Sequence, residues 1–177
     1  MDNIQIIRAY AGDIRRLIDI SRQTFLEAFS DLNSPENMSK HLDQRYSEEQ
    51  LTAELRNADS EFYFAMFEDN VIAYLKLNSG IAQSELQDEN SLEIERIYVL
   101  KVFYGKRVGQ LLYEKALAIA GERNADFIWL GVWEKNSKAI SFYRKNGFVE
   151  FDKHYFMLGD DKQTDIMMKR MLKNNHT

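Results

Sequence analysis

The order of apolar and polar positions divides the chain into segments with helical spacing and segments typical of strands. Apolar residues three and four positions apart predict a first helix from about Asp13. Its apolar positions are Ile14, Leu17, Ile18, Phe25, Ala28 and Phe29. Asn33-Ser34-Pro35 ends this helix, and a short helix is expected over Pro35 to Gln44. The capping-box residues Ser47-Glu48-Glu49-Gln50 then begin another helix, which reaches about Leu55.

Seven runs rich in β-branched and aromatic residues are typical of strands. They are Ile4 to Ala9, Phe62 to Phe67, Val71 to Leu77, Leu92 to Val99, Phe127 to Trp133, Phe148 to Leu158 and Thr164 to Leu172. Glu68-Asp69-Asn70 joins the second and third runs as a hairpin, and Gly159-Asp160-Asp161 joins the last two. The polar stretch Ser79 to Ser91 is predicted to be a loop. Phe127 to Trp133 is apolar throughout, which indicates a strand buried on both faces.

Two more helices lie between the later strands. An apolar stripe follows the fourth strand at Val108, Leu111, Leu112, Ala116, Ile119 and Ala120. A shorter helix opens at Asn136 and stops at Gly147, where a left-handed cap is expected. A strand, a helix and a second strand in succession imply a parallel pair within a mixed sheet. The fold class is therefore α/β (α+β), with helices on both faces of the sheet.

Composition narrows the kind of protein. The 177 residues, 45% hydrophobic and 29% charged, suit a single domain over residues 1–177 with no linker. A net charge of −5 disfavours nucleic-acid binding. The absence of cysteine excludes disulfides and thiol chemistry, and three scattered histidines offer no metal site. With no apolar run long enough to span a membrane and no signal peptide, we expect a cytoplasmic location.

The stretch from Leu92 to Gly109 carries the most specific chemistry. A strand leads through LKVFYGKRVG directly into a helix. Small residues let the backbone approach a ligand, and the first N–H groups of the helix have no partner within it. The sequence therefore predicts a phosphate site, although a surface turn that starts a helix would look the same.

This element order, together with FYRKNGF at Phe142 to Phe148, resembles the GCN5-related N-acetyltransferase (GNAT) superfamily. Within it, the chain is similar to the PaiA-like branch, whose members acetylate spermidine and spermine. That similarity lies in NSPENM, LEIERIYV, IWLGVWEKN and GDDKQTD. The resemblance implies a mixed, mostly antiparallel sheet whose central parallel strands splay apart. It also implies acetyl-CoA as co-substrate and direct transfer of the acetyl group to a primary amine, which we expect to be a polyamine.

The resemblance also implies which residues bind the cofactor. The family pattern Gln/Arg-x-x-Gly-x-Gly/Ala falls on Tyr104 to Gly109, with Tyr104 at the Gln/Arg position and Arg107 at the first glycine. Arg107 could hinder the diphosphate or supply charge to it. Main-chain groups of the preceding strand would pair with the pantetheine arm. The expected cofactor residues are Ile97, Tyr98, Val99, Tyr104, Gly105, Lys106, Arg107, Val108, Gly109, Gln110 and Asn136. Asn136 would equally serve as an ordinary helix N-cap.

Three residues are expected to be catalytic. Tyr143 matches the tyrosine that lies near the thioester sulfur in the family. Glu95 and Glu93 point to one face of their strand, and either could accept the proton that an alkylammonium must lose. Glu95 is the first choice, acting through water. The other readings are a solvated sheet face, or a pair to Arg96 or a lysine, for the glutamates, and an amphipathic-helix position packed with Ala139 and Ile140 for Tyr143. His154 is a further candidate base that would otherwise be structural.

The acceptor leaves several readings open. The first two predicted helices and the last strand pair would shape its site. The acids Glu27, Asp31, Glu36, Asp160 and Asp161 could form a negative rim there. A protein N-terminus, an aminoglycoside or another small amine would suit the same chemistry, and a CoA-binding regulator without turnover is a separate alternative. A homodimer is compatible with exposed aromatic residues, but the sequence does not locate an interface.

Overall fold

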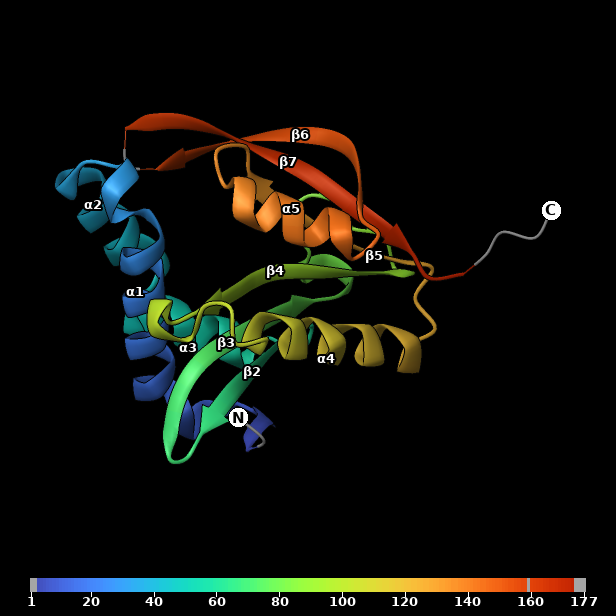
Figure 1. The fold of residues 1–177 in the computed structure, drawn as a ribbon, viewed down its shortest axis with the longest axis horizontal. Coiled ribbons are helices and arrows are strands. Elements are labelled where there is room, and N and C mark those ends of the chain that lie inside the picture. Colours follow the sequence, from blue (N-terminus) through green and yellow to red (C-terminus); the bar gives the residue numbers. More distant parts are fainter. Residues whose placement is uncertain (1–2, 159, 174–177) are drawn as a thin grey trace.

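The computed structural model describes residues 3–158 and 160–173, which form five α-helices and one sheet of seven strands (Figure 1). In chain order the elements are β1 (Ile4–Arg8), α1 (Ile14–Phe29), α2 (Pro35–Arg45), α3 (Glu48–Arg56), β2 (Ser60–Phe67), β3 (Asn70–Asn78), β4 (Ser91–Val99), α4 (Val108–Glu122), β5 (Phe127–Trp133), α5 (Ser137–Lys145), β6 (Val149–Leu158) and β7 (Asp161–Met171). None of the helices in these residues is long and apolar enough to cross a membrane.

The sheet is mixed, with the order β1-β2-β3-β4-β5-β7-β6. All neighbouring strands are antiparallel except β4 and β5, which run parallel, as the sequence predicts. These two strands pair only over Ser91–Glu93 and Phe127–Trp129 and then separate, which confirms the expected splay. Figure 1 shows β6 and β7 on one side of the separation, β4 on the other, and α5 between them.

Helices cover both faces of the sheet because alternate strand residues point to opposite faces. On β2, Tyr63 and Ala65 belong to the core that includes α4 and α5. Phe62 and Phe64 belong to a second core, with residues of α1, α2 and α3. β2 is therefore buried on both faces, and the sheet separates two hydrophobic cores.

The helix ends follow the local sequence closely. Ser34 and Ser47 cap α2 and α3 by accepting the backbone N–H three residues later. The capping box at α3 is only half formed, because the Gln50 amide donates to Glu54 instead of returning to Ser47. Gly147 (φ +86°) closes α5 in a Schellman motif, with the Phe148 N–H donating to the Tyr143 carbonyl at 3.0 Å.

The predicted boundaries differ from the observed ones mainly near β7. That strand begins at Asp161 and not at Thr164, so Asp161 belongs to the ladder and not to the connection. Gly159, which was placed in the same connection, lies outside the described residues. The predicted loop from Ser79 to Ser91 contains one 3₁₀ turn at Gly80–Ala82. The polar pattern misses the start of β7 because an edge hairpin tolerates polar residues on its solvent face.

Candidate active site

A cavity of about 560 Å³ occupies the opening between β4 and β5. Its walls come from β4, β5, α5, β6 and β7 and from the aromatic side chains of α1 and α2. Because the β4–β5 ladder ends at Glu93 and Trp129, the β4 residues beyond it pair only with β3 on their other edge. Ile97 and Tyr98 line the cavity, so an extended ligand can reach the unpaired edge of the strand. This is the position expected for the pantetheine arm along Ile97, Tyr98 and Val99.

The loop before α4 contains two residues with an unusual backbone conformation. Gly105 (φ +75°) and Arg107 (φ +64°) both have left-handed backbones, and no side chain caps α4 at Arg107. The family's glycine at this position is thus replaced by an arginine in a conformation that glycine adopts more easily. The first N–H groups of α4 are left available to an anion.

Side chains around this loop fall into two groups. Tyr104, Lys106 and Arg107 are exposed, and the Lys106 ammonium lies 5.0 Å from the centre of the Phe103 ring. Val108 is buried, and a β-carbon built on Gly109 would lie 3.9 Å from the Val99 side chain, an ordinary contact. The Gln110 amide donates to Glu114 and Asn146, at 3.2 Å each, and so ties α4 to the end of α5.

Helix α5 presents Asn136 and Tyr143 to the cavity. The Asn136 carbonyl oxygen accepts the Ala139 N–H at 3.2 Å, so this residue is the N-cap of the helix. Tyr143 packs against Phe142 and Phe148, and the Schellman motif fixes its backbone. Burial raises the pKa of Tyr143, and the nearby Tyr113 adds to the effect. Its phenol therefore stays protonated and can donate a hydrogen bond.

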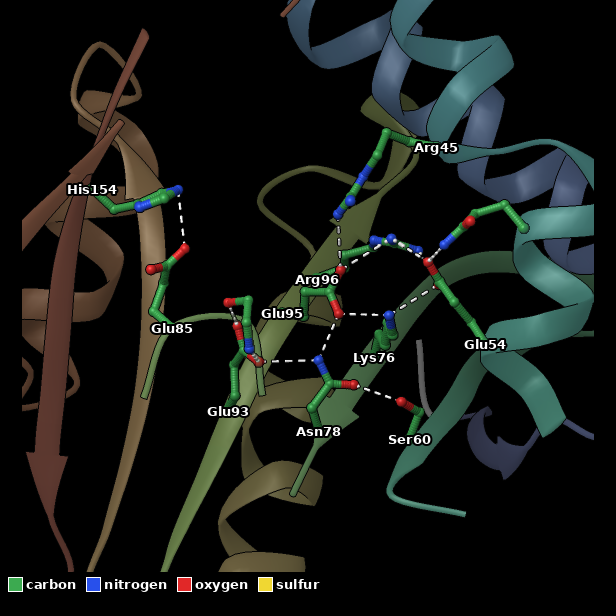
Figure 2. Close-up of polar contacts among 12 residues, drawn as sticks. Arg45, Glu54, Ser60, Lys76, Asn78, Glu85, Glu93, Glu95, Arg96 and His154 are labelled. Atoms are coloured by element: carbon green, nitrogen blue, oxygen red, sulfur yellow. Dashed lines mark hydrogen bonds and ion pairs between the residues drawn. The ribbon is translucent and has the colours of Figure 1, made fainter. Parts of the chain in front are cut away.

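Glu95 sits at a bulge in β4, opposite the Lys76/Leu77 step of β3, and is surrounded by cations (Figure 2). Its carboxylate contacts Arg96 at 3.0 Å, Lys76 at 2.5 Å and Arg45 at 3.3 Å. Burial alone would raise the pKa of Glu95, but Arg96 and Lys76 lower it to about 2. A carboxylate this acidic holds a proton poorly and is a weak base at neutral pH.

The cations around Glu95 share a second anion, Glu54 of α3. Arg96 contacts Glu54 through both terminal nitrogens, at 2.9 and 3.1 Å, and Lys76 contacts it at 3.0 Å. Lys76 and Arg96 are almost fully buried, and the Arg96 guanidinium stacks over Tyr46. The network joins α2, α3, β3 and β4 and fixes the backbone where β4 begins to leave β5.

Glu93 lies in the last pair of the β4–β5 ladder and has no cationic partner among the described residues. The Ser84 hydroxyl donates to one carboxylate oxygen, and the Ser84 N–H (2.8 Å) and the Asn78 amide (3.0 Å) donate to the other. The Asn78 amide also donates to Glu95 at 2.6 Å, so both glutamates lie on one face, as predicted. Burial raises the pKa of Glu93, and the charge of Glu95 raises it further.

The wall opposite β4 carries His154, a candidate base in the sequence analysis, and Asp165, which had no predicted catalytic role. Asp165 on β7 is paired with Trp133 of β5 and His154 of β6. The His154 imidazole contacts the Glu85 carboxylate at 3.0 Å, on the far side of the cavity from the Glu95 network (Figure 2). Glu85, Trp133, His154 and Asp165 line the cavity. Of the polar residues around Glu93 and Glu95 described above, Glu54, Lys76 and Asn78 do not line it. For Asp165 the available sequence signal is Gly131, a lone glycine within an apolar strand, which marks a close approach.

The predicted negative rim does not form at the cavity, because none of its five acids lines it. Glu27 accepts the Lys101 N–H at 2.7 Å and holds the loop after β4. Asp160 pairs with Lys40 at 2.7 Å, and Asp161 accepts a hydrogen bond from Gln163. These acids are used for structure, which sequence position alone does not reveal. In the described part of the chain, no group of three or more histidines and acids could hold a metal ion.

Comparison with known proteins identifies the family. The family profile described as "Acetyltransferase (GNAT) family" matches residues 18–148. An uncharacterized N-acetyltransferase of Lactobacillus delbrueckii subsp. lactis is 41% identical over 172 residues, covering 97% of this chain and 99% of the relative. A spermidine N(1)-acetyltransferase of Thermoplasma acidophilum is 27% identical over 150 residues, covering 82% and 88%.

The fold is also similar to that of a solved structure. The crystal structure of PaiA N-acetyltransferase from Thermoplasma acidophilum in complex with coenzyme A superimposes with a TM-score of 0.78 at 24% identity, covering 96% of this chain and 99% of that one. A cavity between splayed parallel strands with a buried tyrosine on its wall, and a helix N-terminus without a side-chain cap, are thus found in a chain that matches the family over most of its length. The protein therefore belongs to the acetyltransferase (GNAT) family and is an N-acetyltransferase that uses acetyl-CoA.

Proposed function

We propose that this enzyme transfers acetyl directly to a primary amine of a polyamine such as spermidine or spermine. The observation that carries the proposal is the cavity itself. It holds the ionised network of Glu95 together with two further carboxylates, Glu93 and Asp165, that form no ion pair with any described residue. This excess of negative charge favours a cationic acceptor. The 27% identical spermidine acetyltransferase supports the same acceptor class.

In the proposed complex, the diphosphate binds the first turn of α4 and the loop Tyr104 to Gly109, where Lys106 and Arg107 add positive charge. The pantetheine arm extends along the free edge of Ile97, Tyr98 and Val99. The Asn136 side-chain amide, whose carbonyl already caps α5, is free to contact the cofactor. This arrangement places the thioester where β4 and β5 separate, between Tyr143 and the glutamates.

The amine must be neutral before it attacks the thioester carbonyl carbon. Of the two predicted bases, we assign this role to Glu93, acting through a water molecule, because its pKa is raised while that of Glu95 is lowered to about 2. Glu95 instead holds β4 in place. As the C–S bond breaks, the Tyr143 hydroxyl donates a hydrogen bond to the leaving sulfur. A phenol with a raised pKa is a poorer acid than the thiol formed, so the interaction stabilises charge more than it transfers a proton.

An acceptor screen with acetyl-CoA and detection of released thiol tests the proposal. We expect spermidine and spermine to give the highest kcat/KM, about tenfold above an N-terminal peptide or an aminoglycoside. Tyr143→Phe should lower kcat about 10- to 100-fold with unchanged acetyl-CoA affinity. Glu93→Gln should lower kcat and remove the acid limb of its pH profile, whereas Glu95→Gln should leave that limb in place. A peptide as the best acceptor would contradict the polyamine assignment.

A further inference from the structure

The Asp165 carboxylate is the least satisfied charge in the cavity. It is only partly exposed, and among residues 3–158 and 160–173 no side chain or backbone group donates a hydrogen bond to it or forms an ion pair with it. By contrast, Glu93 accepts three hydrogen bonds and Glu95 contacts three cations. A half-buried anion without a partner is unfavourable, and folded proteins retain such groups mainly at functional sites.

The local backbone makes room for this carboxylate. A β-carbon built on Gly131 of β5 would lie 3.2 Å from Asp165 Oδ2, a tighter contact than side chains normally make. Any other residue at this position would therefore crowd the carboxylate. Gly131 is exposed to the cavity although its neighbours Leu130 and Val132 are buried. Asp165 thus stands over the part of β5 that faces the separation from β4, where the acceptor nitrogen must approach.

The charged groups that face Asp165 leave its charge uncompensated. On β6, His154 is held by Glu85 of the segment before β4, at 3.0 Å. On β4, Glu93 and Glu95 add negative charge across the cavity. The cations of the same cavity, Arg45 of α2 and Arg96 of β4, are engaged by Glu95 and Glu54. His41 of α2 is neutral at pH 7, because its pKa is lowered to about 4. Burial is the main cause, and the positive charges of Arg45 and Arg96 add to it. Tyr143 of α5 is neutral as well.

We propose that Asp165 is the counter-ion that binds the acceptor amine in its protonated form, before the proton passes through water to Glu93, and so selects cationic over neutral amines. The inference rests on the proposed function and adds the residue that recognises the acceptor. Burial raises the pKa of Asp165 to about 6, with His154 lowering it and Glu85 raising it. The carboxylate is therefore ionised at pH 7 and becomes neutral below about pH 6. Spermidine remains cationic over this range, so loss of affinity there reports on the protein.

Steady-state kinetics with spermidine between pH 5 and 8 test this role. Relative to wild type, Asp165→Asn should raise KM roughly 30-fold at pH 7.5, with a smaller change in kcat. The wild-type KM should rise as the pH falls through about 6, and this rise should be absent in the variant. Asp152→Asn, which removes an equal charge from an exposed position on β6, should behave as wild type. An unchanged KM in Asp165→Asn would overturn the proposal.

Thermal unfolding without ligand separates recognition from a structural role. An acid whose pKa is raised on folding destabilises the native state above that pKa. Asp165→Asn should therefore melt higher than wild type at pH 7.5, by roughly 3–6 °C, and nearly equally at pH 4. A lower melting temperature at pH 7.5 would show that the carboxylate supports the fold, against the proposal.

The two proposals fail in different ways. If wild type does not use spermidine, the polyamine assignment fails, and the pH comparison is repeated with the amine that the screen identifies. A preferred acceptor that is uncharged at pH 7, such as an arylamine, would overturn the role of Asp165 as a counter-ion. A cationic acceptor whose KM depends on Asp165 would support it with a corrected substrate.

Discussion

The backbone conformation of Arg107 is unfavourable for the folded state, whereas its side-chain charge is expected to favour binding of the cofactor. Its φ of +64° lies in the left-handed region, which costs an L-residue about 1–2 kcal/mol relative to the right-handed one. Glycine, which the family pattern places at this position, would avoid that cost. The guanidinium is exposed next to the first turn of α4, where a diphosphate is expected to bind. We infer that the charge offsets the strain when the cofactor is present.

Arg107→Gly should therefore separate the two effects. The free energy of unfolding should rise by about 0.5 kcal/mol, because relief of strain exceeds the entropy that glycine adds to the unfolded chain. Affinity for acetyl-CoA should fall about fivefold through loss of a charge-assisted contact. Chemical denaturation and calorimetry measure the two quantities. Tighter binding in the variant would show instead that the arginine hinders the diphosphate.

Asn136 raises a similar question at the scale of an element, since it caps α5 and faces the cavity. The cap is observed, whereas the contact with the cofactor is inferred. Serine caps a helix as well as asparagine does but has no amide, so substitution can distinguish the two roles. The comparison matters for catalysis because α5 also carries Tyr143.

Asn136→Ala should lower the free energy of unfolding by about 1 kcal/mol, and Asn136→Ser should restore most of that loss. If the amide contacts acetyl-CoA, both variants should bind it more weakly than wild type. Urea denaturation and cofactor titration of the same samples give the answer. Full recovery of cofactor affinity in Asn136→Ser would leave the residue as a cap alone.

The sequence predicts the elements well and the polar interior poorly. Helix α4, strand β5 and the hairpin of β2 and β3 follow from hydrophobic period and turn residues, which are local signals. The bulge at Glu95 leaves no such signal. The partners of Glu95 also come from distant positions, with Arg45 fifty residues away. The alternative of a pair to Arg96 or a lysine is correct for Glu95, but periodicity does not reveal which other charged residues are turned inward. The roles of Arg45 and Glu54 and the isolation of Asp165 could therefore not be predicted.

At the scale of the whole molecule, two carboxylates make stability depend on pH in opposite ways. The pKa of Glu95 is lowered on folding, so its contribution is present above its ordinary value of 4.5 and is lost as the pH falls toward about 2. The pKa of Asp165 is raised from 3.8 to about 6, so its contribution is lost as the pH rises through that interval.

Glu95→Gln should lower the free energy of unfolding by about 3 kcal/mol at pH 7, because buried Lys76 and Arg96 lose a shared anion. The difference from wild type should shrink below pH 4. Glu48→Gln, which breaks the exposed pair with Arg15, should change stability by less than about 0.5 kcal/mol. Guanidinium denaturation at pH 7 and pH 3.5 measures these differences. Equal stability of Glu95→Gln and wild type at pH 7 would contradict the role of the network.

The early separation of β4 from β5 has a consequence for how this protein can evolve. If the donor molecule is held by main-chain groups along the free edge of β4, as proposed, its recognition depends little on the identity of the side chains there. Mutations can therefore change the side chains on the walls, and with them the acceptor, while recognition of the donor persists. Selection for a new amine would act on a few positions, such as Asp165 and Gly131, and would not require a second invention of the acetyl-transfer machinery.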